Sequence, residues 1–301
     1  MRKILVLGGN GFLGRNLCAY LAKKGEEVYS FDMSLPEQKD KRIQYLTGDF
    51  FDDYTLETVI KGMDVIYHAI CTLNPGNSNE KCIVGYERDF VQTAKLCYYL
   101  KDTSCRMIFF SSGGTVYGNQ EQQPIREDAV PVPINHYGNL KLCIENTIRT
   151  FNFQMKKNML VARISNPYGP GQDYHKGVGF IDAAIKRAIN GETIEIWGEG
   201  NNVRDYIYVD DVCRMLYALI DYHGEQEVFN LSSSVGASQN DIVEILKKLS
   251  PEVKVIYKPA RSVDAKKIIL DNHRIRSVCD FEMVSLETGI QRYYDYIKQG
   301  K

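Results

Sequence analysis

The sequence predicts an α/β fold in which helices cover both faces of a doubly wound parallel sheet. Three observations lead to this prediction. Short apolar runs alternate with helical patterns along the first half of the chain, which is typical of parallel sheets. A glycine-rich segment follows the first apolar run and opens the first helical pattern. Beyond residue 165 turn-forming residues accumulate, which indicates a smaller C-terminal lobe.

The expected elements follow one another in the order that such a sheet requires. Strands are expected at short apolar runs, namely residues 3–7, 27–31, 43–46, 64–68, 106–111 and 160–164. Helices are expected where apolar residues recur at helical spacing, namely residues 13–24, 81–101 and 137–152. Further along, the pattern predicts a helix near 178–190, a short strand at 194–197 and another strand of the main sheet at 228–231. Right-handed crossovers narrow the topology to the doubly wound class.

The length of 301 residues exceeds the usual size of one domain, so two parts are expected. Residues 1–165 are assigned to the sheet domain, and residues 203–232 return to it. Residues 166–202 and 233–301 are assigned to the smaller lobe, which begins with a loop of turn formers at 166–171.

Composition narrows the class of protein. A net charge of -1 gives no reason to expect nucleic acid as the main partner. The eight cysteines contain no CxxC pair for zinc or redox chemistry, so reduced thiols are expected. No stretch approaches the roughly 20 apolar residues of a membrane span, and the apolar run at 4–7 is too short for a signal peptide. We therefore expect a cytoplasmic enzyme with no membrane partner.

The glycine-rich segment predicts a phosphate-binding loop. It consists of Gly8, Gly9, Asn10, Gly11, Phe12, Leu13 and Gly14. Glycines there allow a tight turn and a close approach of the backbone to a pyrophosphate. The following helix N-terminus offers N–H groups and a partial positive charge. Because the segment lies between a strand and a helix, it predicts a Rossmann-type dinucleotide site.

Asp32 predicts which dinucleotide binds. It ends the second strand, 18 residues after Gly14. A carboxylate at this place accepts hydrogen bonds from the adenosine ribose hydroxyls and repels a 2′-phosphate. No Arg or Lys follows before Lys39. The sequence therefore favours NAD over NADP as the cofactor.

Tyr137 and Lys141 form a candidate catalytic pair. They stand four positions apart at a helix start, so that their side chains share one face. A lysine cation beside the phenol stabilises the phenolate and lowers the tyrosine pKa. The tyrosine then moves a proton to or from a substrate hydroxyl while the cofactor carries the hydride. The spacing alone is common among 20 tyrosines, but this pair follows a hydroxyl-bearing loop at 111–118.

Together these motifs resemble the NAD-dependent epimerase/dehydratase family, the extended short-chain dehydrogenases that include UDP-glucose 4-epimerases. The resemblance runs along nearly the whole chain and also includes residues 48–49, 68–69, 166–169, 203–211 and 261–264. Several such motifs in order are specific for the family and far less specific for the substrate.

The resemblance implies further cofactor contacts. Asp49 and Phe50 should approach the adenine, His68, Ala69 and Ile70 should line the cofactor, and Ser165 should lie on the nicotinamide side. With the glycine loop and Asp32, the expected cofactor set is completed by Ser111, Tyr137 and Lys141. No second ligand stands at metal spacing from His68, so no metal is expected.

The resemblance also implies a nucleotide-sugar site. Asn166 and Arg204 match contacts to the diphosphate, which the arginine fork fits well. Arg261 and Asp264 match a pair that holds the diphosphate and the nucleoside ribose. The remaining expected substrate residues, around the nucleobase and the sugar, are Phe180, Ile181, Glu195, Ile196, Trp197 and Ile268. Core packing is the alternative role for Trp197.

Three departures from the family pattern bear on the chemistry. Gly113 stands where 4-epimerases usually carry a Ser or Thr that bonds the reacting sugar oxygen, so Thr115, or failing that Ser112, has to supply a hydroxyl. Asp89 replaces an Asn that many relatives carry, and an acid there is expected to change the sugar contacts. The 4,6-dehydratases carry an Asp-Glu pair where this chain has Gly114 and Thr115, which disfavours a dehydratase.

The leading functional hypothesis is epimerisation at C4 of a UDP-hexose of the glucose or galactose type, with or without an N-acetyl group. A nucleotide-sugar 4-ketoreductase needs the same tyrosine and lysine and is the second hypothesis. A non-catalytic NAD-binding regulator is the third, and the intact pair argues against it.

A homodimer is also expected, through helices at about 81–101 and 140–151 whose apolar positions include Ile83, Phe90, Val91, Ala94, Tyr98, Leu140, Ile144, Ile148 and Phe151.

Overall fold

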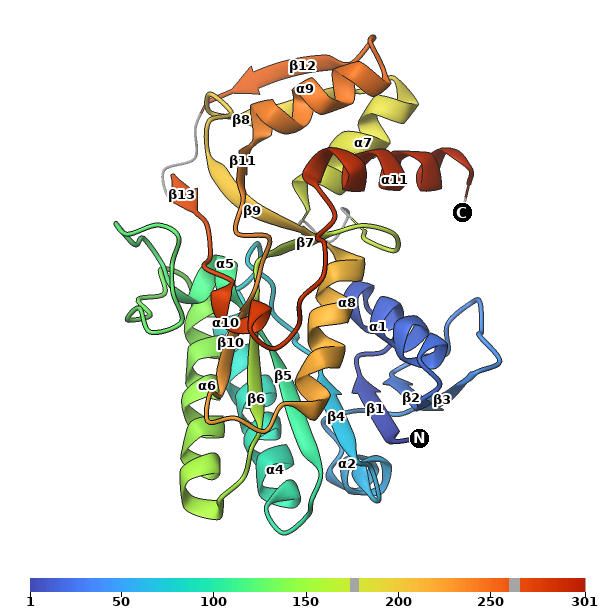
Figure 1. The fold of residues 1–301 in the computed structure, drawn as a ribbon, viewed down its shortest axis with the longest axis vertical. Coiled ribbons are helices and arrows are strands. Elements are labelled where there is room, and N and C mark those ends of the chain that lie inside the picture. The colour runs from blue at the N-terminus through green and yellow to red at the C-terminus, as the bar shows by residue number, and fades with distance from the viewer. Residues whose placement is uncertain (174–178, 260–265, 301) are drawn as a thin grey trace.

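Seven parallel strands form the central sheet of the computed structural model, which describes residues 1–173, 179–259 and 266–300 (Figure 1). Along the sheet they lie in the order β10 (Val228–Leu231), β6 (Leu160–Ile164), β5 (Arg106–Ser112), β4 (Val65–His68), β1 (Lys3–Leu7), β2 (Glu27–Asp32) and β3 (Ile43–Thr47). Every neighbouring pair is parallel. The predicted doubly wound fold is therefore confirmed. The strand order reverses between β1 and β4, where such sheets form a ligand-binding crevice.

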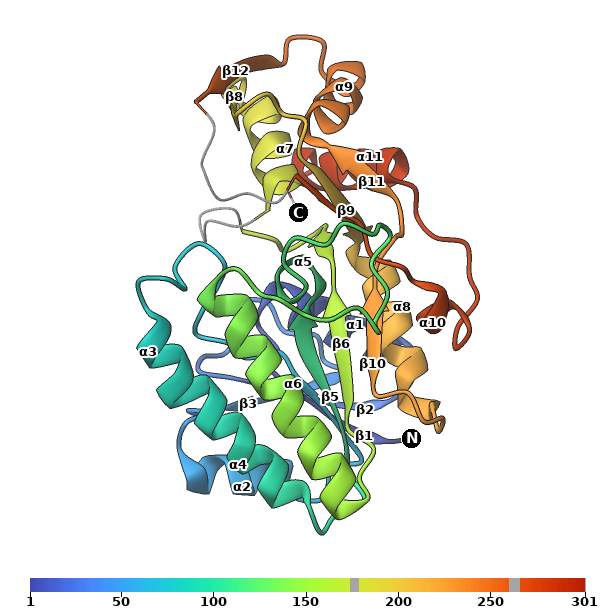
Figure 2. The ribbon, with the colours of Figure 1, turned by 90° about the vertical axis from the view of Figure 1, so that its left-hand side faces the viewer.

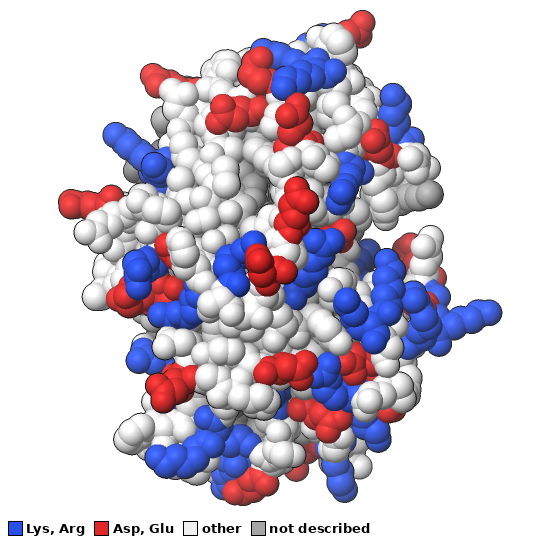
Figure 3. Space-filling view, viewed as in Figure 1, with Lys and Arg blue, Asp and Glu red and all other residues white. Residues whose placement is uncertain are grey.

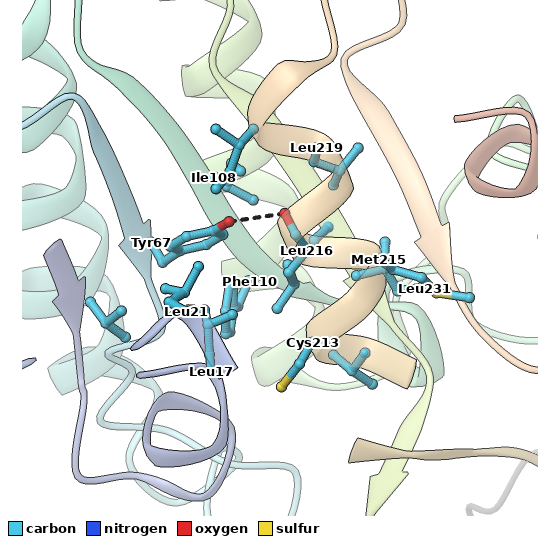
Figure 4. Packing of buried hydrophobic residues seen from close by; sticks show 14 of the residues in the cluster. Leu17, Leu21, Tyr67, Ile108, Phe110, Cys213, Met215, Leu216, Leu219 and Leu231 are labelled. Carbon is cyan, nitrogen blue, oxygen red and sulfur yellow. Dashed lines mark hydrogen bonds between the residues drawn. The ribbon is translucent and has the colours of Figure 1, made fainter. Parts of the chain in front are cut away.

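Helices cover both faces of this sheet. On one face lie α1 (Phe12–Lys23) and α8 (Val209–Ala218), and on the other lie α2 (Asp53–Ile60), α4 (Val91–Leu100) and α6 (His136–Met155) (Figures 1 and 2). Successive strand residues point to opposite faces, so β1 fills one core with Ile4 and the other with Leu5. Figure 4 shows the first core, in which the Tyr67 hydroxyl donates to the Leu216 carbonyl at 2.9 Å.

A smaller lobe stands above the carboxyl ends of the central strands (Figure 1). Its four-stranded sheet contains β7 (Asn166–Tyr168), β9 (Val203–Tyr208), β11 (Gly236–Ser238) and β13 (Lys267–Ile268). A separate pair consists of β8 (Thr193–Trp197) and β12 (Lys254–Lys258). Three helices enclose the apolar core of the lobe, namely α7 (Phe180–Asn190), α9 (Gln239–Leu249) and α11 (Leu286–Lys298).

The structure departs from the sequence prediction in several elements. The helix expected over 81–101 consists of three consecutive pieces, α3 (Cys82–Val84), the π-helical turn η1 (Gly85–Phe90) and α4. Helices α2 and α8 were not predicted, although both pack on the sheet. The short elements α5 (Gly113–Val116) and η3 (Leu219–Asp221) were not predicted either, whereas α10 (His273–Arg276) is one of the short helices expected over 233–301.

The expected return to the sheet domain at residue 203 is wrong for β9. This strand pairs with β7, β11 and β13 in the lobe, and the chain re-enters the sheet domain only with α8. The assignment of all of 233–301 to the lobe is also wrong, because α10 lies beside β10 and its Ile275 is buried in the core of the sheet domain. In both places long-range pairing decides the boundary.

The surface carries charges of both signs. Figure 3 shows basic and acidic side chains on the same face, with a broad uncharged area among them. Over the described residues, no helix combines the length and the apolar character that a membrane crossing requires.

Candidate active site

The glycine loop lies at the carboxyl end of β1 and leads directly into α1. Gly8 has a φ of +86°, and the N–H groups of Gly8 and Gly9 donate to the Phe31 carbonyl at 2.9 and 3.1 Å. An added Cβ at Gly14 would lie 2.1 Å from the Gly8 carbonyl oxygen, so only glycine lets the helix pack this closely on the loop. No side chain caps the N-terminus of α1 at Gly11. This arrangement fits a dinucleotide pyrophosphate.

Asp32 stands beside this loop. Its carboxylate accepts from the Asn10 N–H at 3.0 Å and from the Met33 N–H at 2.8 Å. Asp49, which follows β3, accepts from the Phe51 N–H at 2.9 Å. These carboxylates therefore follow neighbouring strands at the same edge of the sheet, where the ribose and the adenine are expected.

The residues that follow β4 divide between core and crevice. The His68 side chain is buried between the rings of Phe50 and Phe109, and its Nε2 lies 2.9 Å from the Thr93 hydroxyl. Burial, with Lys141 nearby, lowers the pKa of His68 to about 3, so the ring is neutral. Ala69 and Ile70 instead have backbone atoms 3.3 Å from an ideal Cβ at Gly8, which puts them against the glycine loop.

Tyr137 and Lys141 share one face of the first turns of α6. Asn135 caps this helix by accepting from the Gly138 N–H at 2.8 Å. The Lys141 ammonium is buried, donates to the Phe110 carbonyl at 2.9 Å and lies 5.6 Å from the centre of the Tyr137 ring. Burial raises the pKa of Tyr137, and Lys141 opposes that increase. The ammonium is thus placed to stabilise the phenolate.

Lys141 keeps its proton despite being buried. Burial alone lowers the pKa of Lys141, but Cys71, Tyr137 and Asp89 raise it, and the net pKa lies above its ordinary value. A permanent cation therefore stands behind the tyrosine.

The turn after β5 brings hydroxyl groups toward Tyr137. Ser112 and Thr115 both line the same cavity as Tyr137. The Thr115 hydroxyl oxygen is buried without a hydrogen-bond partner among the described residues. A side chain at Gly113 would require Leu270 to move, since the added Cβ would lie 2.2 Å from Cδ1 of Leu270. Ser111 was expected at the cofactor, but its hydroxyl donates inward to Glu145 and does not line this cavity.

A cavity of about 600 Å³ lies between the sheet domain and the lobe. Eleven of the sequence-predicted site residues line it: Phe12, Ser112, Thr115, Tyr137, Ser165, Asn166, Phe180, Ile181, Trp197, Arg204 and Ile268. Trp197 is 38% exposed, so core packing does not account for it. The cavity is long enough to connect Tyr137 of the sheet domain with Trp197 and Arg204 of the lobe.

The junction between β6 and β7 is held by a buried carboxylate of β9. Asp205 accepts hydrogen bonds from the Ser165 hydroxyl at 3.3 Å and from the Ser233 N–H at 2.9 Å, and the Leu270 N–H donates to it at 3.2 Å. The Asn166 amide donates to the Asp205 carbonyl at 2.9 Å. Burial raises the pKa of Asp205 to about 6. One side chain thus ties together three segments that surround the cavity.

Some expected site residues lie elsewhere. Ile196 is fully buried in the core of the lobe, and Glu195 pairs with Lys258 at 2.8 Å, so neither lines the cavity. Arg261 and Asp264 lie outside the described residues. Asp89, expected to change the sugar contacts, is buried and does not line the cavity.

Several cavity residues were missed in the sequence. They are Asn74, Pro75, Gly114, Gly118, Ile134, Asn135, Pro167, Tyr168, Gln172, Gly179, Asn202, Tyr206 and Gln239. Two signals pointed to some of them: Asn74 and Pro75 follow β4 at the crevice, and Asn135 is a helix-capping residue just before Tyr137. Among the described residues no group of His, Cys, Asp or Glu side chains is arranged to hold a metal ion.

The fold and the site together place a dinucleotide-type glycine loop and a tyrosine–lysine pair at one end of the central sheet. Comparison with known sequences specifies the family. The sequence profile of the NAD dependent epimerase/dehydratase family matches residues 4–232, so the chain belongs to this family and its cofactor is NAD.

Individual relatives match over almost the whole chain. A dTDP-4-dehydro-6-deoxyglucose reductase of Escherichia coli is 28% identical, covering 98% of this chain and 97% of its own. A UDP-glucose 4-epimerase of Halalkalibacterium halodurans is 26% identical, covering 98% and 96%. The crystal structure of UDP-glucose 4-epimerase from Thermotoga maritima with UDP-glucose has a TM-score of 0.92 at 28% identity and covers 99% of both chains. The relatives act on nucleotide sugars but differ in reaction.

Proposed function

We propose that the protein is an NAD-dependent 4-epimerase of a UDP-hexose of the glucose or galactose type, with or without an N-acetyl group. The observation that carries this proposal is the cavity that joins Tyr137 and Thr115 at one end to Trp197 and Arg204 at the other. A nucleotide-linked sugar fits such a cavity with its base near Trp197, its diphosphate near Arg204 and its sugar at Tyr137. The similarity to UDP-glucose 4-epimerases supports the same choice.

Different residues of the chain would bind different parts of the cofactor. The glycine loop and the N-terminus of α1 would hold the pyrophosphate, and Asp32 would hold the adenosine ribose. Asp49 would approach the adenine, and Lys141 and Tyr137 would face the nicotinamide end. Bound NAD supplies the acceptor, and later the donor, of one hydride.

Tyr137 is the general base and general acid of the proposed reaction. Its phenolate, which the buried ammonium of Lys141 stabilises, takes the proton of the C4 hydroxyl and becomes the neutral phenol. The Thr115 hydroxyl bonds the same sugar oxygen in place of the side chain that Gly113 lacks. Loss of the C4 hydride to bound NAD would leave a 4-keto sugar, and the cavity would let this sugar turn so that the hydride returns to its other face. Tyr137 finally returns the proton to the oxygen.

A nucleotide-sugar 4-ketoreductase is the second candidate. It is favoured by the E. coli reductase, which is similar to this chain along nearly its full length. The tyrosine–lysine pair serves both reactions equally. Asp32 favours the epimerase, because a reductase that consumes reducing equivalents often uses NADPH, whereas an epimerase regenerates NAD.

Product analysis without added reductant distinguishes the two activities. The purified protein is incubated with UDP-glucose, UDP-galactose and their N-acetyl forms, and the sugars are separated by chromatography or identified by NMR. Interconversion of one C4 pair with no net change of cofactor is the expected result. If all four sugars are recovered unchanged while a 4-keto nucleotide sugar is reduced with added NADH, the epimerase proposal is wrong.

We also propose that the protein is a cytoplasmic homodimer. Ile83, Val84, Val91 and Tyr98 are exposed along α3 and α4, which lie side by side with α6 (Figure 2). Leu140, Ile144 and Ile148 of α6 are buried within the chain itself, so the contact would depend on the α3–α4 surface and on the exposed Phe153. All eight cysteines are free thiols, which suits a reducing compartment.

Light scattering at micromolar concentration measures the proposed assembly. A dimer that dissociates on Tyr98→Glu supports it, with the exposed Tyr54→Glu on α2 as a matched control. A monomeric wild-type protein contradicts it.

A further inference from the structure

A buried carboxylate that the proposed reaction does not use lies behind the tyrosine–lysine pair. Asp89, in the π-helical turn η1, is only 2% exposed. One of its oxygens accepts from the Thr72 N–H at 2.9 Å, the Thr72 hydroxyl at 2.8 Å and the Cys71 thiol at 3.4 Å. Its other oxygen, Oδ1, is buried without a partner among the described residues. Such an unsatisfied charged atom is costly, and π-helical turns often occur at functional sites.

Packing connects Asp89 to Lys141. The Asp89 carbonyl accepts from the Thr93 hydroxyl at 2.6 Å, and that hydroxyl lies 2.9 Å from Nε2 of His68. The ring of His68 lies 5.5 Å from the ring of Phe109, over which the Lys141 ammonium lies at 4.6 Å. One contiguous set of contacts therefore runs from the backbone of Asp89 to the Lys141 ammonium.

The absence of a side chain at Gly85 brings η1 close to α6. An added Cβ there would lie 2.3 Å from Leu73 and 3.1 Å from Leu140, the residues next to Thr72 and Lys141. The π-helical turn is thus pressed against both the loop after β4 and the helix that carries the pair.

We propose that Asp89 is a positioning residue for the Tyr137–Lys141 pair: its buried carboxylate fastens the loop at Cys71 and Thr72 beside the pair and supplies the negative charge that balances Lys141. Glu145, the other carboxylate near Lys141, is bound by Arg163 at 2.6 Å. Asp89 forms no ion pair within the described part of the chain. It is therefore the carboxylate available to compensate the ammonium.

The charge of Asp89 has a direct consequence for proton transfer. Burial raises the pKa of Tyr137, Lys141 lowers it, and Cys71 and Asp89 raise it further. Burial also raises the pKa of the Cys71 thiol, so this group is neutral at neutral pH. His68 is neutral as well. Removing the charge of Asp89 should consequently lower the pKa of Tyr137.

The substitution Asp89→Asn tests this charge while preserving the loop. An amide oxygen can still accept from the N–H and hydroxyl of Thr72. The acid limb of the kcat/KM profile should move to lower pH by about 1 unit, the lower end of what a nearby charge produces. Asp52→Asn, which removes an exposed carboxylate from the N-cap of α2, is the matched control and should leave the limb in place. An unmoved limb in Asp89→Asn overturns the proposal.

A double-mutant cycle measured by urea unfolding tests the charge balance without any activity. Lys141→Met should leave Asp89 as an uncompensated buried charge, so adding Asp89→Asn should raise the unfolding midpoint of Lys141→Met while lowering that of the wild type. Additive effects of the two substitutions overturn the proposal. The pH profile rests on the proposed function, since it requires turnover by Tyr137. The double-mutant cycle measures only stability, so it tests the charge balance even if the protein converts no nucleotide sugar.

Discussion

Replacing Gly113 by alanine should destabilise the protein, whereas the same change at the adjacent Gly114 should not. Both glycines lie in α5, so the entropic gain of about 0.4–1 kcal/mol from restricting the unfolded chain is common to both. At Gly113 the new Cβ would lie 2.2 Å from Cδ1 of Leu270 and 3.2 Å from the Arg163 carbonyl oxygen. At Gly114 the nearest atom is 3.6 Å away, which is ordinary contact.

The magnitude follows from the packing of Leu270. This side chain is fully buried, so it has little room to turn away from an added methyl group. Overpacking of this kind costs about 1–3 kcal/mol. We therefore expect the free energy of unfolding of Gly113→Ala to be lower than that of Gly114→Ala by that amount. Leu270→Ala alone should cost about 2–5 kcal/mol. In the double variant the clash is gone, so the total loss should be smaller than the sum by about 1–3 kcal/mol.

Urea unfolding followed by far-ultraviolet circular dichroism measures the wild type and the four variants. The coupling between Gly113 and Leu270 is taken from the free energies of unfolding of the wild type, Gly113→Ala, Leu270→Ala and the double variant. Equal stability of Gly113→Ala and Gly114→Ala would refute the reasoning, as would strict additivity of Gly113→Ala and Leu270→Ala. Either result would mean that Leu270 does not exclude a side chain at position 113.

Three further predictions concern catalysis, cofactor choice and pH. Tyr137→Phe should bind nucleotide normally but lose about 10²–10⁴-fold in turnover, and Thr115→Ala should lose less, both by steady-state kinetics. Asp32→Ser should narrow the preference for NAD over NADP in calorimetry, because the charge that repels a 2′-phosphate is gone. Burial raises the pKa of Asp205 from 3.8 to about 6. The stabilisation of the fold by the protonated Asp205 carboxyl is thus fully present below pH 3.8 and is lost as the pH rises through about 6. Relative to Asp205→Asn, the wild type should therefore lose roughly 1–3 kcal/mol of stability over that window, measured by urea unfolding at several pH values.

Each of these predictions has a clear contrary result. Near wild-type turnover of Tyr137→Phe would remove that residue from proton transfer, and full activity of Thr115→Ala would leave Gly113 without a substitute. An unchanged ratio of NAD to NADP affinity in Asp32→Ser would move selectivity to other residues. A stability difference between the wild type and Asp205→Asn that does not vary with pH would show that the carboxyl keeps its ordinary pKa.

The candidate site was predictable where its geometry is local. The glycine loop lies between a strand and a helix that the hydrophobic pattern predicts, and Tyr137 and Lys141 share a face because they are one helical turn apart. Strand β8 was also predicted. Which of its side chains face the cavity was not predicted correctly. Ile196 points into the core that α7 and α9 help to form, and Glu195 points toward Lys258. A two-residue period defines two faces but does not say which one meets the ligand.

Partners from distant segments decided where some of the predicted side chains point. Ser111 has a hydroxyl at the right strand end, but Glu145 of α6 accepts its proton inside the domain. His68 ends β4, yet the rings of Phe50 and Phe109 and the Thr93 hydroxyl enclose it. Neither partner can be recognised from the residues that flank Ser111 or His68 in the chain.

By itself the sequence determined the parallel sheet, the dinucleotide loop and the tyrosine–lysine pair, because backbone sterics and helical periodicity act over a few residues. Only the tertiary structure decided that β9 belongs to the lobe, that Leu270 occupies the space beside Gly113, and that the Asp89 carboxylate binds Thr72 and does not line the cavity. These outcomes depend on close packing between segments far apart in the chain, where one side chain fills the space that another leaves.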